Sequence, residues 1–223
     1  MSIGIIVAMS KELRLILPLV EGLHEVTHGT TLLYEGSVGA NRVAIMECGI
    51  GKVNAAMGAT LMIEHYHPDL IVSSGVGASA SGDVAVMDTV IATGVVHHDF
   101  WCIGEDWGRV PGSPRVLPAV TFAEIIPEGE GVKHGLIASG DLFISNRAEV
   151  DRILGHFPEA KAVDMESAAI AQVCASFGVP FFGMRVISDS PWASHDNSRQ
   201  YDDFWEDAPR HSFNLVKKLL TSL

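Results

Sequence analysis

The chain of 223 residues contains little of what builds several common classes of protein. It has three cysteines, Cys48, Cys102 and Cys174, and widely spaced thiols in odd number predict neither a disulfide framework nor a zinc site. Basic residues are also scarce, because 15 Lys and Arg against 27 Asp and Glu give a formal net charge of -12. Without a basic run or stripe, we expect no nucleic acid and no anionic membrane as partner.

Long apolar segments and internal divisions are missing as well. No apolar run reaches the ~18 residues of a membrane-spanning helix. The N-terminal sequence MSIGIIVAMSKEL lacks the basic region and long apolar core of a secretory signal, so we expect a cytoplasmic protein. No repeat, low-complexity tract or linker interrupts the chain. With 48% hydrophobic residues, it predicts a single domain over residues 1–223 with a full core.

What is present is an alternation of short β-rich apolar runs with helical patterns. Strands are expected at residues 3–8, 31–35, 42–47, 70–74, 89–93, 135–139, 160–164 and 181–187. Helices are expected at residues 10–17, 52–66 and 148–156, before Gly178, and at the C-terminus around Val216 and Leu220. This order predicts an α/β fold with a mixed, mostly parallel sheet flanked by helices on both faces.

Several local features follow from the same patterns. Ser10 is expected to cap the first helix. Residues 100–130, rich in Gly, Pro and Trp, predict a long irregular segment of the kind that is usually functional, and a polar loop is expected after residue 187. In the helix over residues 52–66, the stripe expected to face the core consists of Val53, Ala56, Met57, Thr60 and Leu61.

Two glycine motifs resemble nucleotide-binding signatures without meeting their requirements. Gly75, Gly77 and Ala80 match G-x-G-x-x-A, with Asp99 roughly 20 residues on as a ribose-binding acid would be. That fingerprint must open a helix, whereas SGDVAVMDTVIATG predicts a turn and another strand, so close backbone packing is the better interpretation. The turn at residues 49–51 does open a helix, but it lacks the Lys-Ser/Thr of a phosphate loop. It is either a tight turn or a nucleoside-contacting loop.

A metal site is also disfavoured. His97 and His98 are adjacent on an expected strand, so their side chains point to opposite faces and do not converge on one ion. We therefore expect neither a metal nor a cofactor.

Charged residues at the ends of apolar strands are the main functional signal. Arg185 and Asp189 lie in FFGMRVISD, and Glu166 follows the strand in AVDMES. Such residues are seldom buried unless they are paired or belong to a site, and ligands of open α/β sheets bind at the carboxyl ends of strands. Glu12 lies in the first turn of a helix. Alternatives remain open, because Glu12 and Glu166 could be helix-dipole charges and Asp189 an Asx turn.

Several motifs together carry a family resemblance. GIIVAMSKE, CGIGKVNAA, SGVGAS, IASGDLFI, AVDMESAAIAQVC and MRVISD resemble, in order and spacing over nearly the entire chain, those of the 5'-methylthioadenosine/S-adenosylhomocysteine nucleosidases. The resemblance implies a nucleoside phosphorylase-like fold and a homodimer without metal or cofactor. It also implies a small-molecule adenine nucleoside as substrate, hydrolysed between adenine and a 5'-substituted ribose.

The resemblance also implies roles for individual residues. Asp189 matches the general acid that protonates N7 of adenine, with Ser188 orienting it. Glu12 matches the base that takes a proton from the attacking water, near Arg185. Those that match the family's substrate-binding positions are Glu166 for the ribose hydroxyls, Met165 beneath the sugar, Phe143 stacked on adenine, the backbone of Ile144 at its edge, and Met9, Ile50 and Tyr201 lining the pocket.

The chain departs from the family at Val76, where many relatives have Ser or Thr, at Tyr201, where Phe is expected, and in the shorter loop FWCIGEDWGRVPG. This loop resembles the partner-contacting loop of the family, and its aromatic residues are expected to be exposed. Two other functions remain open. A phosphate-dependent purine nucleoside phosphorylase would use cations such as Arg14 or Arg185. A non-catalytic nucleoside or dinucleotide binder would not need Glu12 and Asp189 together.

Overall fold

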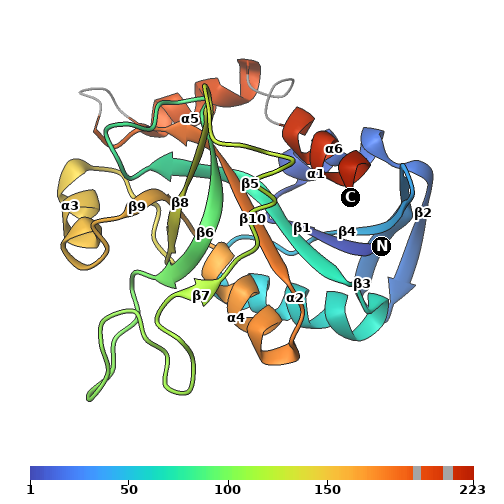
Figure 1. Ribbon diagram of the computed structural model, residues 1–223, viewed down its shortest axis with the longest axis horizontal. Helices are drawn as coiled ribbons and strands as arrows, with labels where there is room; N and C mark the ends of the chain where they lie inside the picture. The colour runs from blue at the N-terminus through green and yellow to red at the C-terminus, as the bar shows by residue number, and fades with distance from the viewer. Residues whose placement is uncertain (193–196, 208–212) are drawn as a thin grey trace.

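The computed structural model describes residues 1–192, 197–207 and 213–223 (Figure 1). Its strands form one mixed sheet in the order β10-β6-β8-β9-β5-β1-β4-β3-β2, with β7 paired to β6 and β10 also paired to β5. The strands are β1 (Ser2–Val7), β2 (Glu21–His28), β3 (Thr31–Val38), β4 (Asn41–Glu47), β5 (Leu70–Ser79), β6 (Thr89–His97), β7 (Leu117–Pro118), β8 (Val132–Ser139), β9 (Ala160–Asp164) and β10 (Phe181–Asp189).

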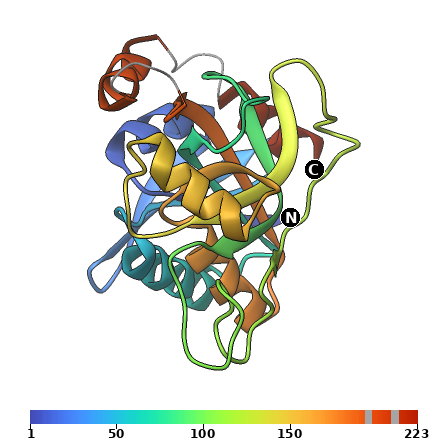
Figure 2. The ribbon, with the colours of Figure 1, turned by 90° about the vertical axis from the view of Figure 1, so that its left-hand side faces the viewer.

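Helices cover both faces of this sheet, which confirms the predicted α/β class (Figures 1 and 2). They are α1 (Ser10–Ile16), α2 (Lys52–Tyr66), α3 (Arg147–His156), α4 (Ser167–Phe177), α5 (Asn197–Asp207) and α6 (Phe213–Ser222), with a 3₁₀ turn at Leu17–Leu19. One core cluster lies under α2 and α4, and a second lies under α1 and α6. Within the described ranges, no helix is both long and apolar enough to cross a bilayer.

The long strand β5 determines where the functional residues gather. It pairs in parallel with β1 and β10, and its last residues pair antiparallel with β9. The sheet closes on itself through β5, β9, β8, β6 and β10 because each pairs with the next. Gly77 permits this closure, since a Cβ there would lie 2.7 Å from the carbonyl oxygen of Val163 in β9. Residues at or just beyond the ends of β1, β5, β8, β9 and β10 gather at one rim of this closed part of the sheet.

The residue that caps the first helix lies one position earlier than predicted. Met9 is the N-cap, with extended backbone (φ -137°, ψ 151°) that continues the direction of β1. The Ser10 hydroxyl instead donates to the carboxylate of Glu47 at 2.8 Å, so the prediction that Ser10 caps the helix is wrong. The backbone amide of Met9 donates to the Glu12 carboxylate at 3.1 Å, which is the half of a capping box that an N3 acid provides.

The predicted core-facing stripe of α2 is also wrong, although the helix bounds are confirmed. Val53 is 72% exposed and Met57 56% exposed. The buried face consists of Ala55, Gly58, Ala59, Met62, Ile63 and Tyr66. Small residues let this helix approach the sheet closely, because a Cβ at Gly58 would lie 2.6 Å from the Cβ of Cys48. Both faces of α2 carry apolar residues, so hydrophobicity alone did not identify the inner one.

Three further differences lie outside the core. Strand β2 was not predicted, because most of its residues are exposed and show no alternation. Part of the expected polar loop after β10 forms α5. The irregular segment at residues 100–130 contains only the two-residue β7, and its part before β7 extends away from the molecule in both views (Figures 1 and 2). Within it, Trp101 is exposed as expected, but the expectation is wrong for Phe100 and Trp107, which are partly buried. The Trp107 ring stacks on the ring of His156, with centroids 4.5 Å apart.

Candidate active site

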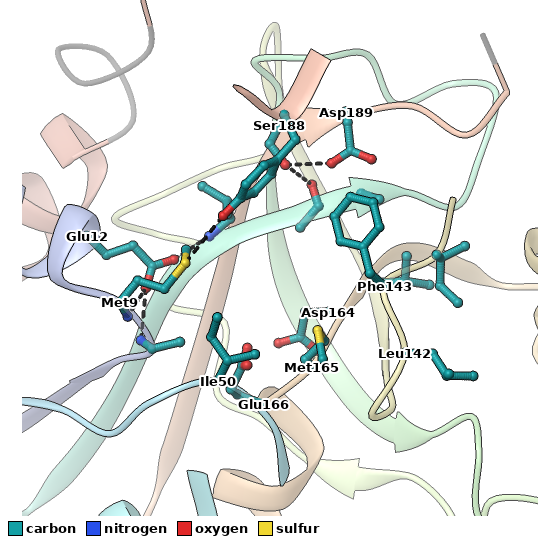
Figure 3. Close-up of a pocket in the computed structure, with 17 residues that line it drawn as sticks. Met9, Glu12, Ile50, Leu142, Phe143, Asp164, Met165, Glu166, Ser188 and Asp189 are labelled. Atoms are coloured by element: carbon teal, nitrogen blue, oxygen red, sulfur yellow. Dashed lines mark hydrogen bonds between the residues drawn. The ribbon is translucent and has the colours of Figure 1, made fainter. Parts of the chain in front are cut away.

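A cavity of about 330 Å³ opens at the rim where the strand ends meet (Figure 3). It contains ten of the eleven residues that the sequence analysis assigned to a site: Met9, Glu12, Ile50, Phe143, Ile144, Met165, Glu166, Ser188, Asp189 and Tyr201. The remaining lining residues are Ala8, Val76, Gly77, Ala78, Leu142, Val163 and Asp164. Arg185 lies behind this cavity, in the wall of a smaller chamber.

Glu12 reaches the cavity from the first turn of α1 and is almost fully buried. Its Oε2 accepts hydrogen bonds from the amides of Ala8 (2.8 Å) and Met9 (3.1 Å), and its Oε1 accepts one from Val76 (3.1 Å). Gly75 leaves room for this carboxylate, because a Cβ there would lie 2.6 Å from Oε1. Burial raises the pKa of Glu12 against the opposing effects of Arg185 and these amides, which makes it a stronger base than an exposed carboxylate.

The same geometry explains the G-x-G-x-x-A motif. Gly75 and Gly77 lie inside β5 and open no helix, so the motif lacks the context of a dinucleotide fingerprint. Their missing side chains admit Glu12 on one side and β9 on the other.

Arg185 is buried in β10 and bound to Asp164 of β9. Its Nε donates to Asp164 Oδ2 at 2.8 Å, and its Nη2 lies 2.7 Å from the same oxygen. Nη2 also donates to the hydroxyl of Ser73 at 3.0 Å. Burial alone would raise the pKa of Asp164, but Arg185 and the hydrogen bonds from Ser139 and Ser167 together outweigh it, and the pKa is lowered. The ion pair balances the arginine charge, so Arg185 is not a free cation for an anionic ligand.

The smaller chamber links Glu12 with Arg185. It has a volume of about 10 Å³, close to the least that holds a water molecule. Polar groups of Glu12, Ser73, Ser74, Glu166 and Arg185 surround it, and Glu12 and Glu166 also line the larger cavity. A water molecule placed in this chamber would have hydrogen-bond acceptors and donors around it. From there it could enter the larger cavity as a nucleophile.

Glu166 lies at the N-cap position of α4, as its strand-to-helix placement predicted. Its Oε1 accepts the amide of Gly51 at 2.9 Å. Gly49 and Gly51 have φ of 91° and 95°, a conformation that favours glycine, so the Gly-Ile-Gly turn is built to present this amide. Burial, followed by repulsion from Asp164, raises the pKa of Glu166 to about 7. Its second oxygen remains available for hydroxyl groups of a ligand.

Asp189 ends β10 on the opposite side of the cavity from Glu12 (Figure 3). Its Oδ1 accepts the hydroxyl of Ser188 at 2.7 Å, and its Oδ2 accepts the side-chain amide of Asn197 at 2.8 Å. Burial raises the pKa of Asp189, while these two hydrogen bonds oppose the rise. A carboxyl group in such a place can hold a proton and donate it to a ligand.

Apolar and aromatic groups form the other wall. Phe143 is 46% exposed and lies edge-on to Tyr201, with ring centroids 5.8 Å apart. The Tyr201 hydroxyl lies 3.3 Å from the sulfur of Met9 and donates to it. The cavity therefore combines a surface for a flat ring with carboxylates for a polar ligand.

The charges of the residues that line the cavity restrict which ligands can bind there. The described lining residues include the carboxylates Glu12, Asp164, Glu166 and Asp189 but no lysine or arginine. Arg14, the other candidate cation, is exposed on α1 outside the cavity. A phosphate group would meet repulsion here, whereas a neutral ligand that develops positive charge would be stabilised.

The histidine pair contributes nothing to this site. His97 bonds through its ring to Gln172 at 2.9 Å and does not line the cavity. In the parts of the chain that the structure describes, no group of three or more His, Cys, Asp or Glu residues is placed to hold a metal ion.

Sequence reasoning missed two polar residues that hold the charged groups of the site, Asp164 and Asn197. Asp164 stands in AVDMES, and the presence of a buried arginine indicated that a partner acid must exist without identifying which one. Asn197 falls where a polar loop was expected, and no signal distinguished it from other polar residues there.

Comparison with known proteins places the chain among related sequences and structures. The family model of the phosphorylase superfamily matches residues 2–221. The chain is 36% identical over 232 residues to a 5'-methylthioadenosine/S-adenosylhomocysteine nucleosidase of Anoxybacillus flavithermus, which covers 100% of this chain and 99% of that protein. It is 38% identical over 225 residues to the protein of that name from an Exiguobacterium species, covering 97% and 96%.

A solved structure agrees with these relatives. It is a nucleosidase of that name from S. pneumoniae with the transition-state inhibitor MT-ImmA. The TM-score is 0.92 at 30% sequence identity, and the match covers 99% of each chain.

Proposed function

The chain belongs to the 5'-methylthioadenosine/S-adenosylhomocysteine nucleosidases of the phosphorylase superfamily, and from this we propose how its own residues carry out that chemistry. The reaction is hydrolysis of the N-glycosidic bond of 5'-methylthioadenosine or S-adenosylhomocysteine, which releases adenine and a 5-thio-substituted ribose. One observation supports the residue assignment most strongly. Two buried carboxyl groups, Glu12 and Asp189, face one cavity from opposite sides, and the described lining residues include no lysine or arginine between them.

Asp189 is the proposed general acid. Adenine leaves poorly as an anion, so a proton must reach its N7 as the bond to the sugar lengthens. Burial favours the protonated form of Asp189, and Ser188 fixes the orientation of its carboxyl group. The proton passes from Asp189 to N7, and adenine departs as a neutral molecule.

Glu12 is the proposed general base. The sugar acquires oxocarbenium character, and water attacks the face opposite to the leaving base, as in an inverting glycosidase. The small chamber beside Glu12 and Arg185 is the place from which that water comes. Glu12 takes one proton from the water as the new C–O bond forms.

The remaining residues hold the substrate. Glu166 accepts hydrogen bonds from the ribose 2'- and 3'-hydroxyls with Met165 beneath the sugar, and Phe143 stacks on adenine. The backbone of Ile144 binds the edge of the base. Met9, Ile50 and Tyr201 line the space for the 5'-substituent and the sugar.

We predict adenine release from 5'-methylthioadenosine in buffer that contains no phosphate. The lining of the cavity offers water a base but offers phosphate only carboxylates, so added phosphate should leave the rate unchanged. Chromatography of adenine and of the sugar product measures this directly. A ribose-1-phosphate product that appears only with phosphate would show a phosphorylase. Binding without any product would show a non-catalytic nucleoside binder.

We also propose that the protein forms a homodimer through the outer face of α2 and its surroundings. Val53 and Met57 of α2 and Phe177 of α4 are large apolar side chains left exposed on adjacent helices. Trp101 and Ile103, of which Ile103 is 89% exposed, extend from the neighbouring loop. Exposed apolar groups gathered in this way mark an interaction surface.

Light scattering should therefore give a mass of two chains at micromolar concentration. Met57→Glu places a charge on the proposed interface and should shift the protein toward the monomer. Leu23→Glu provides the matched control, because Leu23 is exposed on β2 away from this face. A parent protein that is monomeric and fully active would exclude the dimer.

A further inference from the structure

Asn197, the first residue of α5, joins two parts of the site without lining the cavity. Its side chain is only 3% exposed. Its Nδ2 donates to Asp189 Oδ2 at 2.8 Å and to the carbonyl oxygen of Ile144 at 3.0 Å. A carbonyl oxygen only accepts hydrogen bonds, so the atom facing Ile144 must be the amide nitrogen.

The two oxygens held by this nitrogen come from separate segments. Asp189 ends β10, and Ile144 lies in the connection between β8 and α3. Adenine presents an acceptor, N7, beside a donor, its exocyclic amino group, on a single edge. A protonated acid at Asp189 and the Ile144 carbonyl supply the complementary donor and acceptor. Their separation must match that edge, and both lie within 3.0 Å of one Asn197 nitrogen.

We propose that Asn197 is a positioning residue, whose side-chain amide fixes the acid Asp189 at the distance from the Ile144 carbonyl that a 6-aminopurine requires. This inference rests on the proposed function. It assigns Asn197 no contact with the substrate, because the side chain approaches both oxygens from outside the cavity.

Asn197 also affects the proton on Asp189. The Ser188 hydroxyl can turn to the carbonyl of Gly77, 3.3 Å away, and then accept from a protonated Asp189. The Asn197 amide group cannot turn in this way, because its two hydrogens are donated to Asp189 and to the Ile144 carbonyl. Donation from Asn197 therefore favours the carboxylate of Asp189, and its removal should make Asp189 a weaker acid.

Among the residues that the structure describes, the other titratable or charged groups near Asp189 are not altered by a change at Asn197. Those that line the same cavity are Glu12 from α1, Asp164 and Glu166 around the end of β9, and Tyr201 from α5. Arg185 is paired with Asp164, and Arg147 of α3 lies over the ring of Trp192 at 3.6 Å. A change in the titration of Asp189 in an Asn197 variant is thus assigned to the lost amide.

The test compares pH profiles of kcat/KM for adenine release by the parent, Asn197→Asp and Asn197→Ala. Asn197→Asp keeps the shape of the side chain, so we expect the variant to fold. It replaces the amide group that donates to Asp189 by a carboxyl group. In both variants the alkaline limb, which reports the acid, should move up by roughly one to two pH units, as expected for loss of a hydrogen bond to a charged group. The maximal kcat should fall about tenfold because the acid is less well placed.

Gln200→Ala serves as the control on the same helix. Gln200 accepts the amide of Ser190 at 3.0 Å and holds α5 against the end of β10 without touching Asp189. Its loss should leave the alkaline limb in place. If the Asn197 variants also keep the limb in place and lose rate only as Gln200→Ala does, Asn197 merely anchors α5 and the inference is wrong.

Adenine binding separates failure of this inference from failure of the proposed function. Calorimetry in buffers of different ionisation enthalpy measures the protons taken up when adenine binds. The pH range of this uptake should shift in Asn197→Asp even if the parent releases no adenine. An inactive parent would overturn the proposed function alone, whereas unshifted uptake in Asn197→Asp would overturn the role of Asn197.

Discussion

Asp189→Asn should lower kcat for 5'-methylthioadenosine by about 10²–10⁴-fold, the usual contribution of a general acid. The amide is nearly isosteric and retains a hydrogen-bond acceptor for Ser188 or Asn197, but it cannot give a proton to N7. Steady-state kinetics with adenine detection provides the measurement. Affinity for an uncleaved substrate analogue should change only a few fold, because Phe143 and Glu166 remain in place.

A substrate with a good leaving group isolates the cause of this loss. A 5-thio-substituted riboside whose aglycone leaves as a stable anion needs no proton, so Asp189→Asn should cleave it at nearly the parental rate. Asp83→Asn is the matched control. Asp83 is an exposed acid paired with Lys161 at 2.7 Å, and its loss should leave both substrates unaffected. Equal losses on both substrates would indicate that Asp189 acts through structure and not as an acid.

The sequence predicted the positions of the strands better than the faces of the helices. The runs that form β9 and β10 are mostly apolar and buried almost completely, so their composition indicated strands. Helix α2 is apolar on both faces, and its inner face is chosen by the small residues Gly58 and Ala59 that fit against the sheet. Which face a helix buries depends on the shape of its neighbour, which periodicity does not contain.

The site likewise combines features that local sequence predicts with features that only the packing of distant segments creates. Acids placed just beyond strands predicted a cluster at the carboxyl ends, and the structure brings Glu12, Glu166 and Asp189 to one cavity. Their roles came from the family resemblance and remain proposals. Asp164 and Asn197 were missed because each acts through a partner distant in sequence, 21 residues away for the Asp164–Arg185 bond and 53 for the Asn197–Ile144 bond. The first contact is created by closure of the sheet and the second by packing of α5 against it, and neither carries a local sequence pattern.

Glu12→Gln should reduce kcat by a similar factor, about 10²–10⁴-fold, because the amide cannot take a proton from water. Unlike Asp189→Asn, it should be rescued little by the better leaving group, since attack by water is still needed after the aglycone departs. This contrast distinguishes the two carboxyl groups within one reaction. The measurement is the ratio of rates on the two substrates for each variant.

The structural effect of Glu12→Gln must be measured beside its effect on rate. Both carboxylate oxygens of Glu12 accept backbone amides, from Ala8, Met9 and Val76, whereas glutamine offers one oxygen and turns donors toward the other amides. The unmatched donors should cost roughly 1–3 kcal/mol of unfolding free energy, partly offset because a charge no longer has to be buried. Thermal unfolding and analogue binding show whether the variant keeps its fold. Glu47→Gln is the control for the substitution itself, because Glu47 lies outside the cavity and its carboxylate accepts the Ser10 hydroxyl.

The two variants together test the mechanism. If folded Glu12→Gln and Asp189→Asn both stay within a few fold of the parental rate, the two carboxyl groups are structural and the proposed mechanism is wrong.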